Sequence, residues 1–184
     1  MKFRRSLPAL LIFLTLPAPA PASTRHAATL PARSALPNPR LTPGALNPSV
    51  RQADIFRTIC VRGWTRRVRP PERYTERLKR RQIREYGYRD RRLRDYEEDH
   101  LIPLELGGSP ASPENLWPEP HHVSDGWGSY AKDRLENRLN HLVCRGRLSL
   151  ASAREMIAAN WVAAYRHFLG PVPDNRRPRN GWSQ

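Results

Sequence analysis

The stretch YEEDHLIPLELGGSPASPENLWPE, residues 96–119, decides the fold that this chain is expected to adopt. It places Asp99 and His100 in front of an apolar run, and a Gly-Gly turn follows that run. Asn115 comes fifteen residues after His100, at the start of a second extended segment. Two extended segments on either side of a glycine turn are typical of a β-hairpin, so the stretch predicts a hairpin with an Asp-His pair on its first strand.

The first strand is predicted over 96–106, and a short second strand begins at 115–117. Neighbouring side chains of a regular strand point to opposite faces. Asp99 and His100 can therefore reach one ligand only if the strand ends or bulges at the pair. Pro103, which lacks a backbone donor, agrees with an irregular or edge strand.

Helices are predicted before and after the hairpin, over 74–86, 129–144 and 150–169. Gly87 and Gly146 stand where the first two of these helices should end. From Leu135 onward, the apolar residues recur at i, i+4, i+7 and i+8, which is helical spacing. The order of helix, two strands and two helices predicts one small α+β domain.

The chain is strongly basic, with a net charge of +15 over 184 residues. Residues 62–94 hold fourteen Lys or Arg against four Asp or Glu. Such a one-signed excess indicates a polyanionic partner, and nucleic acid, an anionic membrane surface and acidic polysaccharide all satisfy it. The candidate phosphate contacts in this segment are Arg66, Arg67, Arg69, Lys79, Arg80, Arg81 and Arg84.

The first residues have the composition of an export signal. Residues 1–22 combine a basic start, a short apolar core over 7–16 and an A-x-A cleavage site at 20–22. The apolar core is too short for a membrane span, although an uncleaved anchor is the alternative interpretation. We expect an exported chain, periplasmic or secreted, with no transmembrane segment after cleavage. Removing residues 1–22 takes away three cations and no anion, so the net charge falls only to +12.

The rest of the chain divides by composition. Residues 23–48 are rich in Pro and Ala and are predicted to form a disordered linker. The folded domain is expected over 49–171, and 172–184 form a flexible tail. The chain has two cysteines, Cys60 and Cys144. In an exported protein an even count predicts a disulfide, while zinc ligation and two buried free thiols are the alternatives.

Asp99, His100 and Asn115 suit the hydrolysis of a phosphodiester. A neutral imidazole can take a proton from water, and a carboxylate can bind a hard divalent cation. The base generates the nucleophile, and the cation stabilises charge on the phosphate. The amide of Asn115 can both donate and accept. It can therefore tie the loop back toward the strand that carries His100.

These residues resemble a known family. DHLIPL at 99–104, GG at 107–108 and NL at 115–116 resemble the HNH endonuclease motif of the ββα-metal fold. Over 47–169 the chain also resembles exported bacterial HNH-like proteins. The segments that carry this wider resemblance are CVRGWT at 60–65, VRPP at 68–71, YGY at 86–88, NLWP at 115–118, KDRLE at 132–136 and VC at 143–144. The resemblance implies a small ββα-metal hairpin-helix core flanked by additional helices.

The resemblance implies a metal-dependent endonuclease in which His100 is the general base, Asp99 a metal ligand and Asn115 the structural asparagine. Little sequence specificity is expected, and DNA is favoured over RNA. Magnesium is the expected cation, with manganese or zinc as alternatives. The chain departs from the usual motif at Ser124, nine residues past Asn115, where many members carry His or Asn. The candidates for the third motif position are Asp133, which is favoured, His122 and Asn137.

Structural interpretations of the same residues stay open. His100 can be a hydrogen-bonded structural histidine, Asn115 a turn residue and Asp133 a charge near a helix N-terminus. The alternative function is therefore a non-catalytic protein that binds nucleic acid or an anionic cell surface on a degenerate HNH scaffold. A secreted toxin domain is a third interpretation. We expect a monomer.

Overall fold

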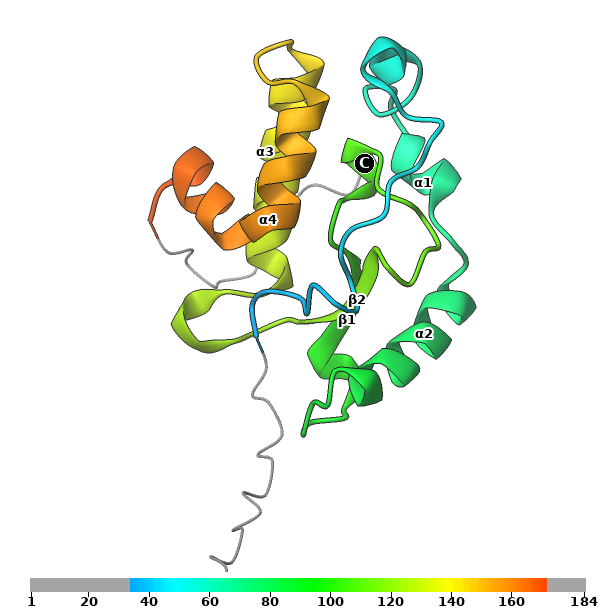
Figure 1. The fold of residues 1–184 in the computed structure, drawn as a ribbon, viewed down its shortest axis with the longest axis vertical. Helices are drawn as coiled ribbons and strands as arrows, with labels where there is room; N and C mark the ends of the chain where they lie inside the picture. Colours follow the sequence, from blue (N-terminus) through cyan, green and yellow to red (C-terminus); the bar gives the residue numbers. More distant parts are fainter. Residues whose placement is uncertain (1–33, 172–184) are drawn as a thin grey trace, which may run out of the picture.

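The computed structural model describes residues 34–171, and a two-stranded antiparallel hairpin lies among its helices (Figure 1). The α-helices and strands, in chain order, are α1 (Trp64–Val68), α2 (Glu72–Glu85), β1 (Tyr96–His100), β2 (Leu116–Pro120), α3 (Ser129–Cys144) and α4 (Leu150–Leu169). The short 3-10 helices are η1 (Gln52–Arg57), η2 (Leu93–Asp95), η3 (Leu104–Leu106) and η4 (Ser124–Gly126). This mixture of helices and an antiparallel hairpin confirms the predicted α+β class.

Several predicted segments fall outside the described residues. They are the signal peptide over 1–22, residues 23–33 of the predicted linker and the predicted tail over 172–184. Within residues 34–171, none of the helices has the length and the apolar composition that crossing a membrane requires.

The hairpin is shorter than the sequence predicted. β1 and β2 pair from Tyr96 opposite Pro120 to His100 opposite Leu116, so the first strand ends at His100 and not at 106. The reason is local, because the side chain of Asn115 takes both backbone hydrogen-bonding groups of the residue that would continue the ladder. The chain then bends into η3. β1 therefore ends at Asp99 and His100. This meets the condition stated above, that the two side chains can reach one ligand only if the strand ends or bulges at the pair.

The Gly-Gly turn after η3 is required by close packing. Gly107 has a φ of 75°, in the left-handed region that favours glycine. At Gly108 a Cβ atom would lie 1.7 Å from the carbonyl oxygen of Ile102, a separation that no side chain can adopt. The backbone N–H of Gly108 donates to Pro103 at 3.0 Å, which closes the turn against the end of the hairpin.

The hairpin lies between α2 on one side and the α3–α4 pair on the other (Figure 1). α2 packs over the hairpin through a cluster that includes Ile83 and Trp117. α3 and α4 pack against each other over a larger cluster that includes Leu139 and Ile157. The site described below is therefore built on a hairpin whose strands pack against α2 and whose loop packs against α3 and α4 through Ile102 and Leu106.

The predicted helices 129–144 and 150–169 agree with α3 and α4, and the prediction 74–86 agrees with α2 to within two residues. α4 is interrupted at Asn160, whose backbone angles of φ −166° and ψ 92° are not helical. The N–H of Ala163 donates to the Asn160 side chain at 2.9 Å, so this amide caps the second half of α4.

Residues 34–48 pack against the domain, although the composition predicted a disordered linker there. Thr42 is fully buried, and its hydroxyl lies 2.6 Å from that of Tyr86. The indole N–H of Trp161 donates to the carbonyl of Ala35 at 2.6 Å. Polar contacts of this kind add to apolar packing, since Ala35, Leu36 and Leu41 contact the two apolar clusters. The packed domain therefore extends at least fifteen residues before the predicted boundary at 49.

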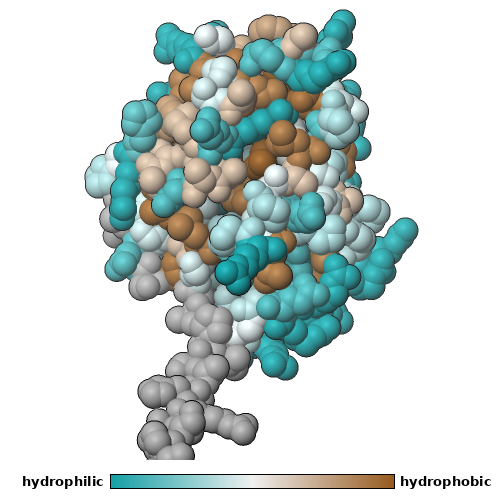
Figure 2. Space-filling model, viewed as in Figure 1, coloured by the Kyte–Doolittle hydropathy of each residue, from teal (hydrophilic) through white to brown (hydrophobic). Residues whose placement is uncertain are grey.

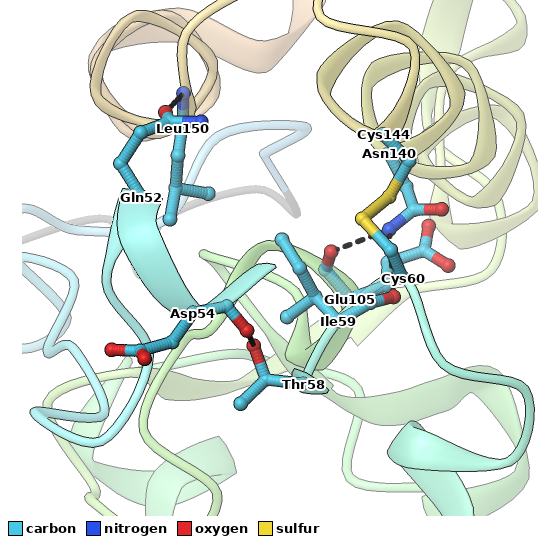
Figure 3. The surroundings of a disulfide bond; sticks show 9 residues. All are labelled: Gln52, Asp54, Thr58, Ile59, Cys60, Glu105, Asn140, Cys144 and Leu150. Atoms are coloured by element: carbon cyan, nitrogen blue, oxygen red, sulfur yellow. Dashed lines mark hydrogen bonds between the residues drawn. A yellow bond between two sulfur atoms is a disulfide. The ribbon is translucent and has the colours of Figure 1, made fainter. Parts of the chain in front are cut away.

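Cys60 and Cys144 form the predicted disulfide, with their Cα atoms 5.6 Å apart (Figure 3). The bond joins the segment before α1 to the last residue of α3, and it excludes both zinc ligation and free thiols for this pair. Beside it, the Asn140 amide donates to the carbonyls of Ile59 at 3.3 Å and Glu105 at 2.8 Å. These contacts hold the segment around α1 against α3.

Candidate active site

A pocket of about 180 Å³ opens beside the end of β1. Its walls come from segments that are far apart in the sequence: the region of α1, the end of β1, η3 and the first half of α3. The lining residues are Thr65, Arg69, Asp99, His100, Pro103, Leu104, Glu105, Asp133, Glu136 and Asn137. The fold thus brings five of the predicted site residues to one pocket, namely Asp99, His100, Asp133, Asn137 and Arg69.

The imidazole of His100 is buried and held by a backbone carbonyl. Its Nε2 lies 2.9 Å from the carbonyl oxygen of Pro110. Because a carbonyl oxygen only accepts, Nε2 carries the proton and Nδ1 is left as the basic nitrogen. Burial lowers the pKa of His100, and the neighbouring Asp99 carboxylate only partly opposes this. The imidazole is therefore neutral near pH 7, the form that can accept a proton.

Asn115 has no exposed surface and ties together the loop between the strands. Its Oδ1 accepts from the N–H of Ile102 at 3.0 Å, and its Nδ2 donates to the carbonyls of Ile102 and Ser109, each at 3.0 Å. The sequence prediction that Asn115 ties the loop back is thereby confirmed. Ser109 directly precedes Pro110, whose carbonyl holds the His100 ring, so the amide also fixes the segment that orients the imidazole.

Lys132, on the first turn of α3, is fully buried next to Asp99 and His100 at the end of β1. Its ammonium donates to Oδ2 of Asp99 at 2.6 Å, to the carbonyl of His100 at 2.7 Å and to the carboxylate of Glu136. Burial alone would lower the pKa of this amine, but the carboxylates of Asp99 and Glu136 hold the Lys132 pKa well above its ordinary value. The contacts fasten α3 to the end of β1.

Sequence analysis did not identify Lys132, although a signal was present. The residue precedes Leu135, Leu139 and Val143 by three, seven and eleven positions, which places it on their buried face of the helix. A lysine on an apolar helix face requires a partner, and Glu136 stands at the i+4 position where one can lie.

Asp99 differs from the carboxylates around it. Burial opposes its ionisation, but the Lys132 ammonium holds the pKa of Asp99 below its ordinary value. Burial raises the pKa of Glu119 well above its ordinary value, and the Asp99 charge acts in the same direction. Glu119 lies beside Asp99, and in its protonated form it can donate a hydrogen bond to that carboxylate.

Two other carboxyl groups in the pocket titrate near neutral pH. Burial, with the Asp99 charge, raises the pKa of Asp133 to about 6. Burial, with the Asp133 charge, raises the pKa of Glu105 to about 7. Oε1 of Glu105 is buried without a hydrogen-bond partner. Of the four carboxyl groups that line the pocket, Asp99 is held ionised, Glu136 is paired with Lys132, and the charges of Asp133 and Glu105 depend on what binds beside them.

The donors in the pocket fit magnesium better than zinc. Within residues 34–171, no three or more His, Cys, Asp or Glu side chains are grouped so that they could hold a metal ion. However, magnesium is usually bound by one or two carboxylates, together with water and substrate phosphate. Asp99 and Asp133, with the unpartnered oxygen of Glu105, are oxygen donors of that kind. The residues fit a cation that relies on few protein ligands.

Two of the three candidates for the third motif position line the pocket, and one does not. Asp133 and Asn137 line the pocket, and the amide of Asn137 donates to the carbonyl of Asp133 at 2.8 Å. His122 does not line it. This histidine is exposed on the loop before α3, and its ring centroid lies 5.7 Å from that of Tyr130. The structure therefore brings Asp133 and Asn137 to Asp99, and leaves His122 apart.

The predicted phosphate contacts are exposed, with one exception. Figure 2 shows hydrophilic side chains gathered over α2. The exposed members of the predicted set are Arg66, Arg67, Arg69, Arg80, Arg81 and Arg84. Lys79 is only 7% exposed, and its ammonium donates to the carbonyl of Tyr96 at 3.2 Å and pairs with Glu76 at 2.7 Å. The prediction for Lys79 is wrong, because this lysine lies on the buried face of α2.

Comparisons of this chain with protein-family models, with curated proteins and with solved structures find no match. The function is therefore inferred from the chemistry of the pocket and from the motif that the sequence carries.

Proposed function

We propose that this chain is an exported, metal-dependent endonuclease that hydrolyses nucleic-acid phosphodiester bonds with little sequence specificity. β1, β2 and α3 would form the ββα-metal core of the HNH motif, and α2 and α4 would flank it. The observation that carries the proposal is the pocket at the end of β1. There Asp99 and His100 meet Asp133 of α3 and the guanidinium of Arg69.

The residues of the pocket can divide the work of hydrolysis. Nδ1 of His100 takes the proton from the attacking water, because Nε2 is committed to the carbonyl of Pro110. Arg69 attracts the phosphate into the pocket. Asp99 and Asp133 would hold a divalent cation, which would supply charge stabilisation for the phosphate and the leaving oxygen. Asp99 is kept ionised for this role by Lys132.

Two further features agree with the proposal. The exposed arginines of α1 and α2 offer contacts to a phosphate backbone, which position a nucleic acid without reading its sequence. The disulfide suits an oxidising compartment, as export predicts. We favour DNA as the substrate, magnesium as the cation and a monomer as the acting form.

A non-catalytic binder of nucleic acid is the second candidate, and one observation favours it. The Lys132 ammonium already neutralises Asp99, the carboxylate that a cation would use. In that case the arginines would hold the polyanion and the pocket would be a degenerate site.

Cleavage assays with and without chelator separate the two candidates. The purified, disulfide-bonded protein is incubated with plasmid DNA and with RNA, each across a magnesium, manganese and zinc series. The endonuclease proposal predicts nicked and linear plasmid with at least one metal, and loss of cleavage when chelator is added. DNA binding without cleavage in any metal would make the binder the better account.

A further inference from the structure

Beyond keeping Asp99 ionised, the ammonium of Lys132 has no role in the hydrolysis proposed above, yet its partners Asp99, His100 and Glu136 all line the pocket. Its three N–H groups are all used, by Asp99, by the carbonyl of His100 and by Glu136. Two of these partners belong to the adjacent residues at the end of β1. The lysine therefore binds Asp99 and His100, the two residues on which the proposed site depends.

Stability alone does not explain a lysine at this place. Burying a charge costs free energy, and well-packed apolar residues are often as stabilising as a buried ion pair. On its helix face Lys132 lies beside Leu135 and Leu139, which have no exposed surface, and beside its partner Glu136. An apolar side chain in place of the lysine would be compatible with the leucines, but it would leave the carboxylates of Asp99 and Glu136 without their cation. A charged group retained in such surroundings points to a function of the charge.

We propose that Lys132 is the positioning residue of the candidate site. Its hydrogen bonds fix the carboxylate of Asp99 and the turn of the backbone at His100, so that both groups face the pocket. Its positive charge also opposes a cation at the same carboxylate, so cation binding without substrate is weak. The inference about cleavage rests on the proposed function, whereas the inference about cation binding does not.

A second buried lysine supplies a matched control. Lys79 is 7% exposed, donates to the carbonyl of Tyr96 on β1, and pairs with Glu76 on its own helix. Its chemistry parallels that of Lys132, but neither Tyr96 nor Glu76 lines the pocket, whereas the partners of Lys132 do. Loss of a buried lysine as such can therefore be separated from loss of the lysine that holds Asp99.

The test compares wild type with Lys132→Met, Lys132→Met/Glu136→Gln and Lys79→Met, all with the disulfide intact. Manganese binding is measured by calorimetry without nucleic acid, and plasmid cleavage is measured in parallel. Thermal unfolding establishes that each variant is folded. The double variant removes one positive and one negative charge together, so it keeps the net charge of the cluster while it removes the contacts to Asp99.

The two readouts should move in opposite directions. A unit charge a few ångströms from the cation is worth a factor of about ten or more in affinity, so Lys132→Met should bind manganese at least about tenfold more tightly. Loss of the contacts to Asp99 and His100 should lower its cleavage rate by about tenfold or more. The double variant should bind manganese within about threefold of wild type and still cleave slowly. Lys79→Met should change neither.

A folded Lys132→Met variant whose manganese affinity is unchanged or weaker would overturn the proposal. So would a double variant that cleaves as fast as wild type, and this variant decides the question if the single one does not fold. If wild type cleaves nothing, the proposed function fails, and the manganese affinities alone decide the role of Lys132.

Discussion

Replacing Asn115 by alanine should lower the free energy of unfolding by more than the loss of one polar side chain usually does. The change removes the contacts to Ile102 N–H and to the carbonyls of Ile102 and Ser109. Ile102 is 3% exposed, so water cannot replace these partners. A buried polar group left without a partner costs about 1–3 kcal/mol, and two such groups remain on Ile102. We therefore expect the free energy of unfolding to fall by about 3–5 kcal/mol.

The measurement is equilibrium urea unfolding with the disulfide intact, followed by tryptophan fluorescence. Asn115→Asp should lose nearly as much stability, because a carboxylate can accept from Ile102 but cannot donate to the two carbonyls. Asn137→Ala is the control. Its exposed amide bonds only within its own helix, so the change should stay within about 0.5 kcal/mol. A loss below about 1 kcal/mol for Asn115→Ala, or a wild-type value for Asn115→Asp, would refute the reasoning.

Three further changes test other parts of the structure. Reducing the Cys60–Cys144 disulfide should lower the free energy of unfolding by about 4–5 kcal/mol, and equal urea midpoints with and without reductant would contradict this. Burial raises the pKa of Glu98 from 4.5 to about 9, so the folded chain holds this proton more tightly than the unfolded chain. The contribution of Glu98 to stability should therefore be full below pH 4.5 and fall by up to about 1.4 kcal/mol per pH unit toward pH 9, and Glu98→Gln should make the measured fall less steep by this amount. Replacing Arg80 and Arg81 by alanine should flatten the slope of log affinity for duplex DNA against log salt by about 2, and an unchanged slope would remove both from the contact surface.

The features that were predicted correctly from the sequence depend on local spacing. The apolar repeat from Leu135 defines α3, the Gly-Gly turn and Asn115 define the loop of the hairpin, and the even cysteine count indicates the disulfide. Each of these signals is either a pattern over a short stretch of sequence or a count of one residue type. The end of the strand at Asp99 and His100 was not predicted, because the strand was expected to run to 106; it was named only as what a common ligand for the pair would require.

The features that were missed depend on contacts between distant segments. Thr42 packs through a hydroxyl that lies against Tyr86, and the few apolar residues of its segment that pack, such as Leu36 and Leu41, do not form a helical or strand pattern. Lys79 and Lys132 are charged residues whose burial depends on carbonyls and carboxylates supplied by β1. Local composition describes them as surface cations. Only the arrangement of the helices against the hairpin shows that both are internal.

The claim that His100 is the general base is tested most directly by plasmid cleavage with His100→Ala under the metal that supports the fastest wild-type reaction. His141→Ala is the matched control, because His141 is exposed near the end of α3 and does not line the pocket. The account predicts that His100→Ala loses cleavage by about 10²–10⁴-fold, the usual contribution of a general base, while it still binds manganese and His141→Ala cleaves normally. Cleavage by His100→Ala at the wild-type rate would contradict it.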